Sequence, residues 1–594
     1  MLKKFFVFIF IFGLLLSIAP ADTNIHIIGE IILKKNKRLY IDKGRNDGVE
    51  IGHKLDILYD DQKYGSGIIS WVGDDISYAR VDSVSFYRYT FINPLEVRIC
   101  LEQPLKYQGG ALHIPYYRQL NLQPSEIITP DEQTVSCLIY DGLVKLNEQG
   151  QIVPGLAYSW EIHGNTYTFY LNTGVQFHSG KPFNAIDVAY SLVQLAKAPK
   201  VTPSTSFILE VDGYDEVHFN KKNELRGIFI PNKYTIAITT KDTFVPFLKY
   251  LAGSGGYIIP AVQNQQTLPT PIGTGPFKIV NAGDNVIKLS ANENYFDASP
   301  VLDSIICYRY KNRSEAALDF ELGKLDLFFF DSEDYRDFLT NGNYITRRHY
   351  TSSTVILGFN CKHDYQSDFK LSKALQFLFD KESIVRVLLN NSAQKSDGVI
   401  PPALNLESDY VPEYYFSPSD AKQKINRIAG LPDKLNLIYD YLDPALESIA
   451  GYIAGQLRQA DLKISVKGAD KRELEQSADI NSMDIFLFRY DMPVPDPDAF
   501  FYPLFSKRLN GQTNYLYYDN PQLERFLEGA RSFDDSYTIN EIYHDAEKLI
   551  MKQPPLIALY NPIMTVAYRR NLAGFTADSR AFINLQKAFF QAGK

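Results

Sequence analysis

From about Gly109 onwards, the sequence alternates between short apolar runs and helical segments that carry a single apolar stripe. Asn184 and Asp187 are suited to cap a helix whose buried face would hold Ala189, Leu192, Val193 and Ala196. Two more stripes have this spacing: Leu371, Ala374, Leu375 and Leu378, and, after the start signal Asn520-Pro521, Leu523, Phe526, Leu527 and Ala530. Between them, LDLFFF (325–330), TVILGF (354–359) and MDIFLF (483–488) are typical of strands. Helices that bury one stripe against such strands form an α/β protein.

Residues 22–105 have a different pattern, with short alternating patches separated by turn residues. Asp47-Gly48 and Gly52 interrupt the apolar runs, and the patches KLDIL and ISYARV fit half-buried strands. This pattern predicts a small all-β barrel domain of five or six strands. The stretch RNDGVEIGHKLDIL resembles the SH3-like barrels appended to exported and flagellar-assembly proteins, which implies a docking role without chemistry.

The first 21 residues have the pattern of a secretory signal peptide. Lys3 and Lys4 precede an apolar run at 5–19, and Ala19-Pro20-Ala21 supplies the small-residue cleavage pattern. The run is shorter than the ~20 residues that span a bilayer, although a retained anchor is the alternative. No cysteine lies near the cleavage site, which argues against a lipid anchor. We therefore expect a soluble protein, exported and kept in the periplasm by an outer membrane.

The size, charge and cysteines of the mature chain narrow its class. The whole chain has 61 Lys and Arg against 69 Asp and Glu. Cleavage of the signal peptide removes Lys3 and Lys4, so the mature chain has a net charge of about −10 and no basic field to attract nucleic acid. About 570 mature residues exceed one hydrophobic core and predict three or four lobes. Four separated cysteines are open to three pairings or to remaining buried thiols: Cys100, Cys137, Cys307 and Cys361.

Local motifs for catalysis are absent from the sequence. No two of the nine histidines stand four residues apart, so there is no H-E-x-x-H zinc motif. GVQFHSGK (174–181) resembles a phosphate-binding loop, but its glycine spacing is too long and Pro182 replaces the Ser or Thr that would hold magnesium. AGSGG (252–256) lacks the spacing of a nucleophile elbow. The sequence favours a protein that is not an enzyme and needs no cofactor.

A series of segments, in the order of the family, carries a family resemblance. LIYDGLVKLNEQGQIVPGLAYSWEIHGNTYTFYLNTGVQFHSGKPFNAIDVAYSL (138–192) closely resembles the signature region of extracellular solute-binding proteins of the oligopeptide/dipeptide/nickel type (family 5). Further matches follow in the order of the family: PIGTGPFKI (271–279), NENYFD (292–297), LSKALQFLFDKESIV (371–385) with VIPP (399–402), and PDPDAFFYPLF (495–505) with YDNPQLERFLEGA (518–530). The resemblance covers roughly residues 109–590.

The resemblance implies a type II periplasmic binding protein-like fold, with two lobes and an additional subdomain behind the barrel. Residues 106–594 would form the solute-binding domain. Its expected parts are lobe I (106–155, 266–304 and 562–594), subdomain II (156–265) and lobe III (305–561). The implied function is capture of a peptide-like or other small solute for an ABC importer. A monomer would close on the solute by hinge motion and present it to a permease in the inner membrane.

The segment RYDMPVPDPDAFFYPLF (489–505) resembles the family loop that faces the ligand cleft. Its prolines would hold a ligand-facing aromatic and carboxylate in place. The expected ligand-binding residues are Tyr490, Asp491 and Arg489, with Tyr140, Phe359 and Asn360 as further candidates; a core position is the simpler interpretation of Phe359. For Asp496 and Asp498, the alternative is that they cap the following helix.

The loop departs from the family pattern where peptide binders carry the aspartate that pairs with the ligand's α-amino group. Pro493 occupies that position, and Asp491 stands two residues earlier. An ammonium buried without a partner costs several kcal/mol, so the departure argues against an ordinary peptide. A chelated metal is an alternative ligand. His178 and His363 are nearest to the family motifs, and for each a structural role is the simpler interpretation.

Two other functions remain open from the sequence. The extra barrel would suit an envelope sensor or adaptor that docks to a partner. An exported hydrolase would instead assemble its site from distant residues such as Asp491.

Overall fold

The computed structural model divides the chain into two compact units, Met1–Lys106 and Tyr107–Lys594. In the first unit it describes residues 26–35, 38–43, 46, 49, 52–59, 62–72, 76–81 and 96–100. In the second it describes residues 107–147, 149–261, 271–297, 299–330, 344–404, 406, 414–472, 483–577 and 582–591. The expected signal peptide lies outside the described residues. Among the described residues, no helix combines the length and the apolar character that a membrane crossing requires.

The described residues of the first unit form six strands that pair antiparallel in the order β1-β2-β5-β4-β3-β6. β6 pairs with β3 and also with β1, so the order returns to its first strand. Buried side chains alternate along the strands, as the two-residue period requires: Leu39 and Ile41, and Leu55 and Ile57. The bounds are β1 His26–Lys35, β2 Arg38–Ile41, β3 Lys54–Tyr59, β4 Gln62–Val72, β5 Ser77–Val81 and β6 Glu96–Cys100.

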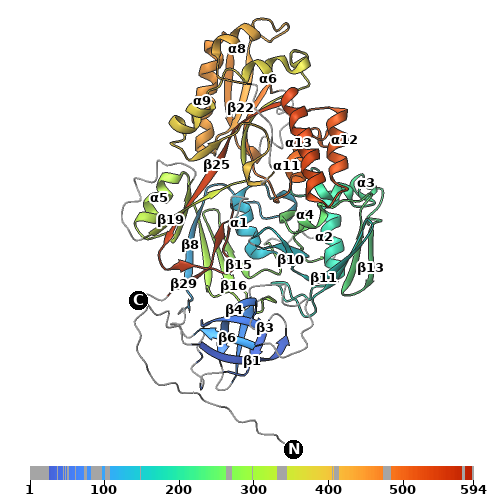
Figure 1. Ribbon diagram of the computed structural model, residues 1–594, viewed down its shortest axis with the longest axis vertical. Coiled ribbons are helices and arrows are strands. Elements are labelled where there is room, and N and C mark those ends of the chain that lie inside the picture. Colours follow the sequence, from blue (N-terminus) through green and yellow to red (C-terminus); the bar gives the residue numbers. More distant parts are fainter. Residues whose placement is uncertain are drawn as a thin grey trace, which may run out of the picture. The chain divides into compact units, whose positions relative to one another are not determined.

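The second unit begins with a four-stranded sheet in the order β15-β16-β17-β8 (Figure 1). β8 and β17 run parallel although about 190 residues separate them in the sequence. Helix α1, Pro130–Ile139, begins at a capping box formed by Thr129 and Glu132 and buries its apolar residues with this sheet. The strand bounds are β8 Ala111–Tyr116, β15 Phe277–Ala282, β16 Val286–Ala291 and β17 Ser304–Arg309.

A second four-stranded sheet, in the order β11-β12-β14-β13, carries helix α2, Ala185–Lys197. The expected cap of this helix is confirmed, because the Asn184 side chain accepts a bond from Ile186 N and the Asp187 carboxylate accepts one from Asn184 N. The Lys181 ammonium bonds to the Asp187 carboxylate, so this lysine supports the helix start. The other bounds are β11 Ala157–His163, β12 Thr166–Leu171, β13 Ile228–Asn232, β14 Thr235–Thr239, α3 Tyr214–His218 and α4 Phe247–Leu251.

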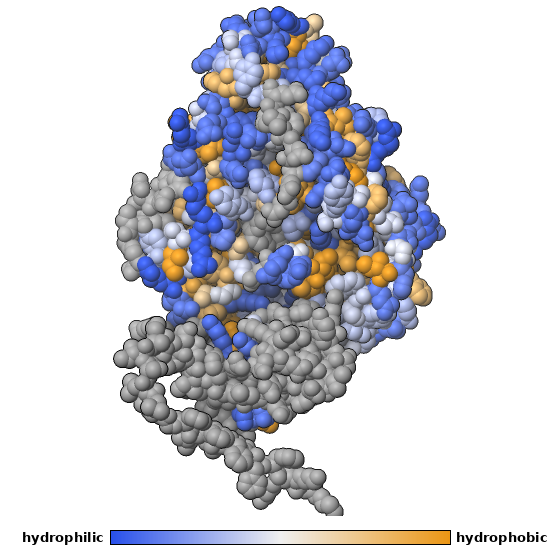
Figure 2. All heavy atoms as spheres, viewed as in Figure 1, coloured by the Kyte–Doolittle hydropathy of each residue, from blue (hydrophilic) through white to orange (hydrophobic). Residues whose placement is uncertain are grey.

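The largest sheet has the central order β18-β25-β20-β24-β22-β23, with β19 and β21 also paired to β25. Helices α6, α8 and α9 gather at one end, near β22 (Figure 1). In α9, Pro444–Gln459, the residues Leu446, Ile449, Ala450, Ile453, Ala454 and Leu457 are buried. This helical stripe leaves a polar outer face, and the surface at this end is mostly hydrophilic (Figure 2).

The strands of this sheet are β18 Leu327–Phe330, β19 Tyr344–Tyr350, β20 Thr354–Phe359, β21 Ala393–Lys395, β22 Leu435–Asp440, β23 Ile464–Ala469, β24 Ile485–Tyr490 and β25 Leu556–Arg569. The helices are α5 Arg313–Glu321, α6 Lys370–Leu375, α7 Lys381–Ser383, α8 Pro418–Ile425, α9, α11 Asp498–Phe505, α12 Pro521–Ala530 and α13 Ser536–Lys552. Short strands complete the unit: β7 Tyr107–Gln108, β9 Val144–Leu146, β10 Ile152–Pro154, β26 Leu572–Ala573, β27 Thr576–Ala577, β28 Ile583–Asn584 and β29 Phe589–Gln591.

Two chain crossings connect lobe I to lobe III. β25 pairs with β20 up to Tyr560 and with β19 from Ile563, so it crosses at residues 561–562. The other crossing lies at residues 351–353, between β19 and β20. The expected boundary at 304/305 is wrong, because it falls inside β17, and β17, β18 and β19 all pair on the lobe I side. Among the described residues, lobe I therefore includes 305–330 and 344–350, subdomain II is 156–261, and lobe III takes the described residues between 354 and 560.

The quoted motifs of lobe I meet around one buried carboxylate. Asp141 accepts bonds from Thr274 Oγ1 at 3.0 Å and Tyr295 Oη at 2.9 Å, and Lys145 Nζ lies 2.6 Å away. Gly273 packs against the same loop, because a Cβ there would stand 2.0 Å from the Ile139 carbonyl oxygen. The motif residues YDGLVK, IGTGPF and NENYF thus stabilise lobe I.

Three of the four cysteines are free thiols: Cys137, Cys307 and Cys361. Cys137 and Cys307 are buried, and burial raises the pKa of the Cys307 and Cys361 thiols to about 12. These two groups are therefore protonated and unreactive near neutral pH.

Candidate functional site

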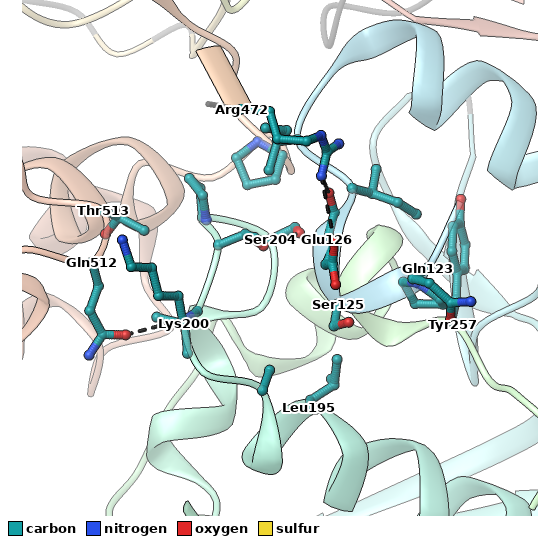
Figure 3. Close-up of a pocket in the computed structure, with 18 of the residues that line it drawn as sticks. Gln123, Ser125, Glu126, Leu195, Lys200, Ser204, Tyr257, Arg472, Gln512 and Thr513 are labelled. Atoms are coloured by element: carbon teal, nitrogen blue, oxygen red, sulfur yellow. Dashed lines mark hydrogen bonds and ion pairs between the residues drawn. The ribbon is translucent and has the colours of Figure 1, made fainter. Parts of the chain in front are cut away.

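A cavity of about 1140 Å³ lies where lobe I, subdomain II and lobe III meet (Figure 3). Segments far apart in the sequence form its walls, which is the arrangement expected of a ligand site between lobes. The lining includes residues 123–128, Gln133, Tyr140 and Tyr257 from lobe I and its junction, residues 190–204 in part from subdomain II, and Ile438, Lys471, Arg472, Phe486, Phe488, Tyr490, Asp491, Pro493, Gln512, Thr513 and Tyr515 from lobe III.

The lobe I wall combines a short polar segment with an aromatic pair. The Tyr140 ring, at the end of α1, stacks on Tyr257 with centroids 5.7 Å apart and an interplanar angle of 20°. Burial raises the pKa of Tyr140, so its hydroxyl stays protonated. Ser125 and Glu126 stand on the other side of this wall (Figure 3). The wall offers both an apolar surface and hydrogen-bonding groups.

The subdomain II wall is the end of α2 and the segment that follows it. Lys197, Lys200 and Ser204 lie here, and Val201 N donates a hydrogen bond to Gln512 Oε1 of lobe III at 3.2 Å (Figure 3). This hydrogen bond connects subdomain II to lobe III at the wall of the cavity.

The lobe III wall follows from the geometry of β24. Phe486, Phe488 and Tyr490 alternate along this strand, and the two-residue period brings all three to the cavity. The Tyr490 hydroxyl donates to the Ala499 carbonyl at 2.5 Å, which fixes the ring. The proline-rich loop begins directly after this residue.

Asp491 is held by three groups. Its Oδ1 accepts a hydrogen bond from Ser353 Oγ at 2.7 Å and forms an ion pair with Arg489 Nε at 2.9 Å, and its Oδ2 lies 3.8 Å from Lys471 Nζ. Ser353 belongs to the crossing at 351–353, so Asp491 joins the cavity wall to a crossing between the lobes.

The other two aspartates of the loop turn away from the cavity. Asp496 Oδ1 accepts from Asp498 N at 2.9 Å, next to the start of α11, and its Oδ2 bonds to Lys249 Nζ at 2.8 Å. Asp498 accepts from Tyr250 Oη at 2.9 Å and from Arg531. Neither lines the cavity. Asp496 supports the start of α11 through its bond from Asp498 N, but the N-cap of this helix is Pro497, and the Asp498 carboxylate does not cap it. Both aspartates tie lobe III to subdomain II.

Two arginine clusters join lobe I to lobe III. Arg118 bonds to Asp440 with both terminal nitrogens, at 3.1 and 2.5 Å. Arg472 donates to the Glu126 carbonyl at 3.2 Å and bonds to the Glu132 carboxylate (Figure 3 shows its approach to Glu126). Both clusters hold lobe I and lobe III together through bonds between their side chains.

The structure brings together three of the six expected ligand residues, Tyr140, Tyr490 and Asp491, in the cavity wall. The other three are not lining residues. Arg489 lies behind Asp491 and also approaches Asp443 at 3.5 Å. Phe359 is fully buried in the core between the sheet and α9, as the simpler interpretation of this residue expects.

The expected place of Asn360 in the cleft is corrected, because this residue is fully buried at the end of β20. Its Nδ2 donates to the Met483 carbonyl at 3.1 Å and its Oδ1 accepts from Lys362 N. Sequence reasoning missed Lys471, Arg472, Glu126 and Tyr257. Nothing local marks them, since Lys471 and Arg472 follow β23 in a stretch that looks like an ordinary solvated loop.

The two histidines considered for a metal lie outside the cavity lining. Nε2 of His178 is 3.0 Å from the Gly275 carbonyl, and burial lowers the pKa of this histidine. His363 stacks on Tyr365 beside Asp484. Within the described parts of the chain, no group of three or more His, Cys, Asp or Glu side chains is arranged to hold a metal ion.

Comparison with protein families gives one match that spans most of the chain. The model described as "Bacterial extracellular solute-binding proteins, family 5 Middle" matches residues 151–512. This range includes the subdomain II wall of the cavity and nearly all of the lobe III wall.

Individual proteins are similar over a larger range. Oligopeptide-binding protein AppA of Bacillus subtilis is 26% identical over 518 residues, covering 81% of this chain and 91% of that protein. Heme-binding protein A of Haemophilus influenzae is 24% identical, covering 75% of this chain and 85% of that protein. Among solved structures, the periplasmic binding protein DppA of Helicobacter pylori, in complex with the peptide STSA, superposes with a TM-score of 0.73 at 21% identity, covering 82% of this chain and 99% of that one. The fold is therefore that of the type II periplasmic binding proteins.

Proposed function

This chain belongs to the bacterial extracellular solute-binding proteins of family 5, and we propose that it captures a peptide-like or other small solute for an ABC importer. The cavity of about 1140 Å³ between the lobes carries this proposal, because its size suits a small solute and its walls come from all three parts. The proteins of this family bind solutes, so no bond is made or broken, and a hydrolase is not proposed.

Capture would proceed by hinge motion at the crossings at 351–353 and 561–562. Tyr490, Asp491 and Tyr140 would contact the solute, with Arg489 holding Asp491. The arginine clusters around Arg118 and Arg472 would form as lobe III closes on lobe I. Closure excludes water and strengthens the polar contacts inside. The closed monomer would then be recognised by a permease in the inner membrane.

The periplasm is the compartment that we propose. Residues 1–21 have the pattern of a cleaved signal peptide. Helicobacter pylori DppA is described as a periplasmic protein. Removal of the leader would leave the 22–105 domain at the mature N-terminus, followed by the 106–594 solute-binding domain.

The experiment is native mass spectrometry of the purified protein, followed by denaturing release. We expect an additional small mass on the wild-type protein, because enclosed sites retain their solutes. Ser125→Trp should remove this mass, since Ser125 lines the cavity and an indole would fill part of it. Ser419→Trp, on the exposed surface of α8, is the matched control and should retain it. A wild-type protein that stays empty after incubation with a periplasmic small-molecule extract contradicts the proposal.

A docking role for the first unit is a second proposal, supported by coverage. The Helicobacter pylori structure is matched over 99% of its length but over only 82% of this chain, so a part comparable in size to the first unit has no counterpart there. We propose that this part is an SH3-like barrel that docks to an envelope partner.

Deletion of residues 22–106 tests the docking role. We expect the shortened protein to bind solute with unchanged affinity and to lose a specific partner that the full chain recovers from crosslinked envelope fractions. Equal recovery by both proteins, or recovery by neither, contradicts the docking role and leaves solute capture untouched.

A further inference from the structure

The described residues that line the cavity include more basic than acidic side chains. Among the described lining residues, the acidic side chains are Glu126 and Asp491, and the basic ones are Lys197, Lys200, Lys471 and Arg472. The described lining thus carries two more positive than negative charges. In a partly enclosed site this excess favours an anionic ligand, because charges there are screened less than on the surface.

Both carboxylates of the lining already have partners within the protein. Asp491 is held by Ser353, Arg489 and Lys471. Glu126 accepts a bond from Asn121 and lies 3.7 Å from Arg472 Nη1. A ligand ammonium would have to share its carboxylate with a cation that is already beside it, and a buried ammonium without a carboxylate of its own costs several kcal/mol. The described lining is therefore poorly suited to an α-amino group.

Lys471 is the basic residue best placed for the ligand. Its Nζ donates to the Arg489 carbonyl at 3.2 Å, and its distance of 3.8 Å from Asp491 is too long for a hydrogen bond. An ammonium has three donors, so Lys471 retains capacity for a ligand oxygen. Its side chain is 17% exposed, and it lines the cavity beside Arg472.

The aromatic residues of the lobe III wall indicate which chemical group the rest of the ligand would carry. Phe486, Phe488 and Tyr490 stand beside Lys471 and Asp491, and the Tyr140–Tyr257 pair faces the same space. Aromatic faces of this kind bind apolar or planar groups. A ligand that fits both features has an anionic group next to an apolar body.

We propose that the solute is an amphipathic anion without a free α-amino group, and that Lys471 binds its carboxylate or phosphate. This inference rests on the proposed function, since it names the class of solute for the same cavity. Arg472 contributes positive charge to the site while it remains bonded to Glu132 and Glu126.

The test measures binding of three probes by calorimetry and thermal shift. The probes are N-acetyl-Ala-Phe-Ala, with a free carboxylate; Ala-Phe-Ala amide, with a free amino group; and phenyl phosphate. We expect the wild-type protein to bind at least one anionic probe and not the cationic peptide amide. The preferred anion distinguishes a carboxylate ligand from a phosphate ligand.

Two variants test whether Lys471 is the residue that binds the anionic probe. Lys471→Gln should weaken the anionic probe about tenfold or more, because it removes one charge-assisted contact. Lys467→Gln, at an exposed position of the adjacent β23, should bind as the wild type does. Tighter binding of the peptide amide, or equal binding of the anion by Lys471→Gln and the wild type, overturns the inference.

Failure of the inference and failure of solute capture remain distinct. If no probe binds, the inference is overturned for this cavity. If the native mass spectra then still show a solute that Ser125→Trp loses, solute capture stands with a ligand of another charge class. If those spectra are also empty, both proposals fail.

Discussion

Replacing Arg531 by methionine is expected to lower the free energy of unfolding by about 3–5 kcal/mol, because it breaks a buried ionic cluster. Arg531 Nε donates to Asp498 Oδ1 at 2.6 Å, and its Nη1 donates to Glu210 Oε1 at 2.8 Å. The arginine side chain is 3% exposed and Asp498 is 1% exposed. Without the guanidinium, two carboxylates from different lobes would face each other across a buried site.

Urea unfolding followed by circular dichroism and tyrosine fluorescence measures this loss, as a lower midpoint with an unchanged slope. Arg226→Met is the matched control. Arg226 also bonds to two acidic residues, Asp212 and Glu216, but its side chain is 69% exposed, so its midpoint should stay close to that of the wild type.

The cluster also predicts a rescue. Burial raises the pKa of Asp498, and Arg531 opposes this shift. Arg531→Met combined with Asp498→Asn removes both the guanidinium and the more buried of its two carboxylate partners. The double variant should therefore unfold at a higher urea concentration than Arg531→Met alone. Equal losses in Arg531→Met and Arg226→Met would contradict the importance of this cluster.

Local features of the fold were predictable from the sequence, whereas the path between the lobes was not. The cap at Asn184 and the helix start at Asn520 depend on residues within one turn, so their signals are present in any short window. The crossing at 351–353 depends on which strand pairs with which part of β25. A run such as LDLFFF is equally apolar on either side of that crossing, and the boundary was therefore placed too early, at 304/305.

Some residues of the candidate site were predictable from the sequence and others were not. Tyr140, Tyr490 and Asp491 stand in or beside segments that resemble a known family, and they line the cavity. Lys471 and Arg472 have no such segment around them. The bond from Arg472 to Glu132 joins residues 340 positions apart, and no pattern in the sequence predicts such a pair.

Asn360 shows the opposite error, whereas Phe359 takes the core position that is the simpler interpretation of it. Both residues stand at the end of β20, which its neighbours cover. Phe359 N donates to the Pro555 carbonyl and Asn360 N to the Asp484 carbonyl, so both residues are enclosed by the sheet. Which strand end is open depends on the packing of the whole lobe, which a single sequence does not reveal.

Arg118 of lobe I and Asp440 of lobe III form a buried ion pair between the lobes. Arg118→Ala is expected to shift the protein towards an open form and to weaken solute binding about a hundredfold. In the closed form the variant would leave Asp440, which is 4% exposed, without its cation. In the open form Asp440 can reach water. A penalty of about 3 kcal/mol on closure corresponds to this change in the closed fraction and in apparent affinity.

Electron–electron distance measurements report the two forms directly. Spin labels at Leu318→Cys on α5 of lobe I and Arg458→Cys on α9 of lobe III are both at exposed positions, in a Cys100→Ser background checked for labelling of the remaining thiols. Arg118→Ala should broaden the label distance and move it away from the wild-type value. Arg309→Ala is the control, because Arg309 donates to Gln119 within lobe I and does not reach lobe III. Arg118→Ala with Asp440→Ala should close more readily than Arg118→Ala alone, since no buried charge is then unpaired. If the single and double variants match the wild-type distances, the pair does not hold the lobes closed.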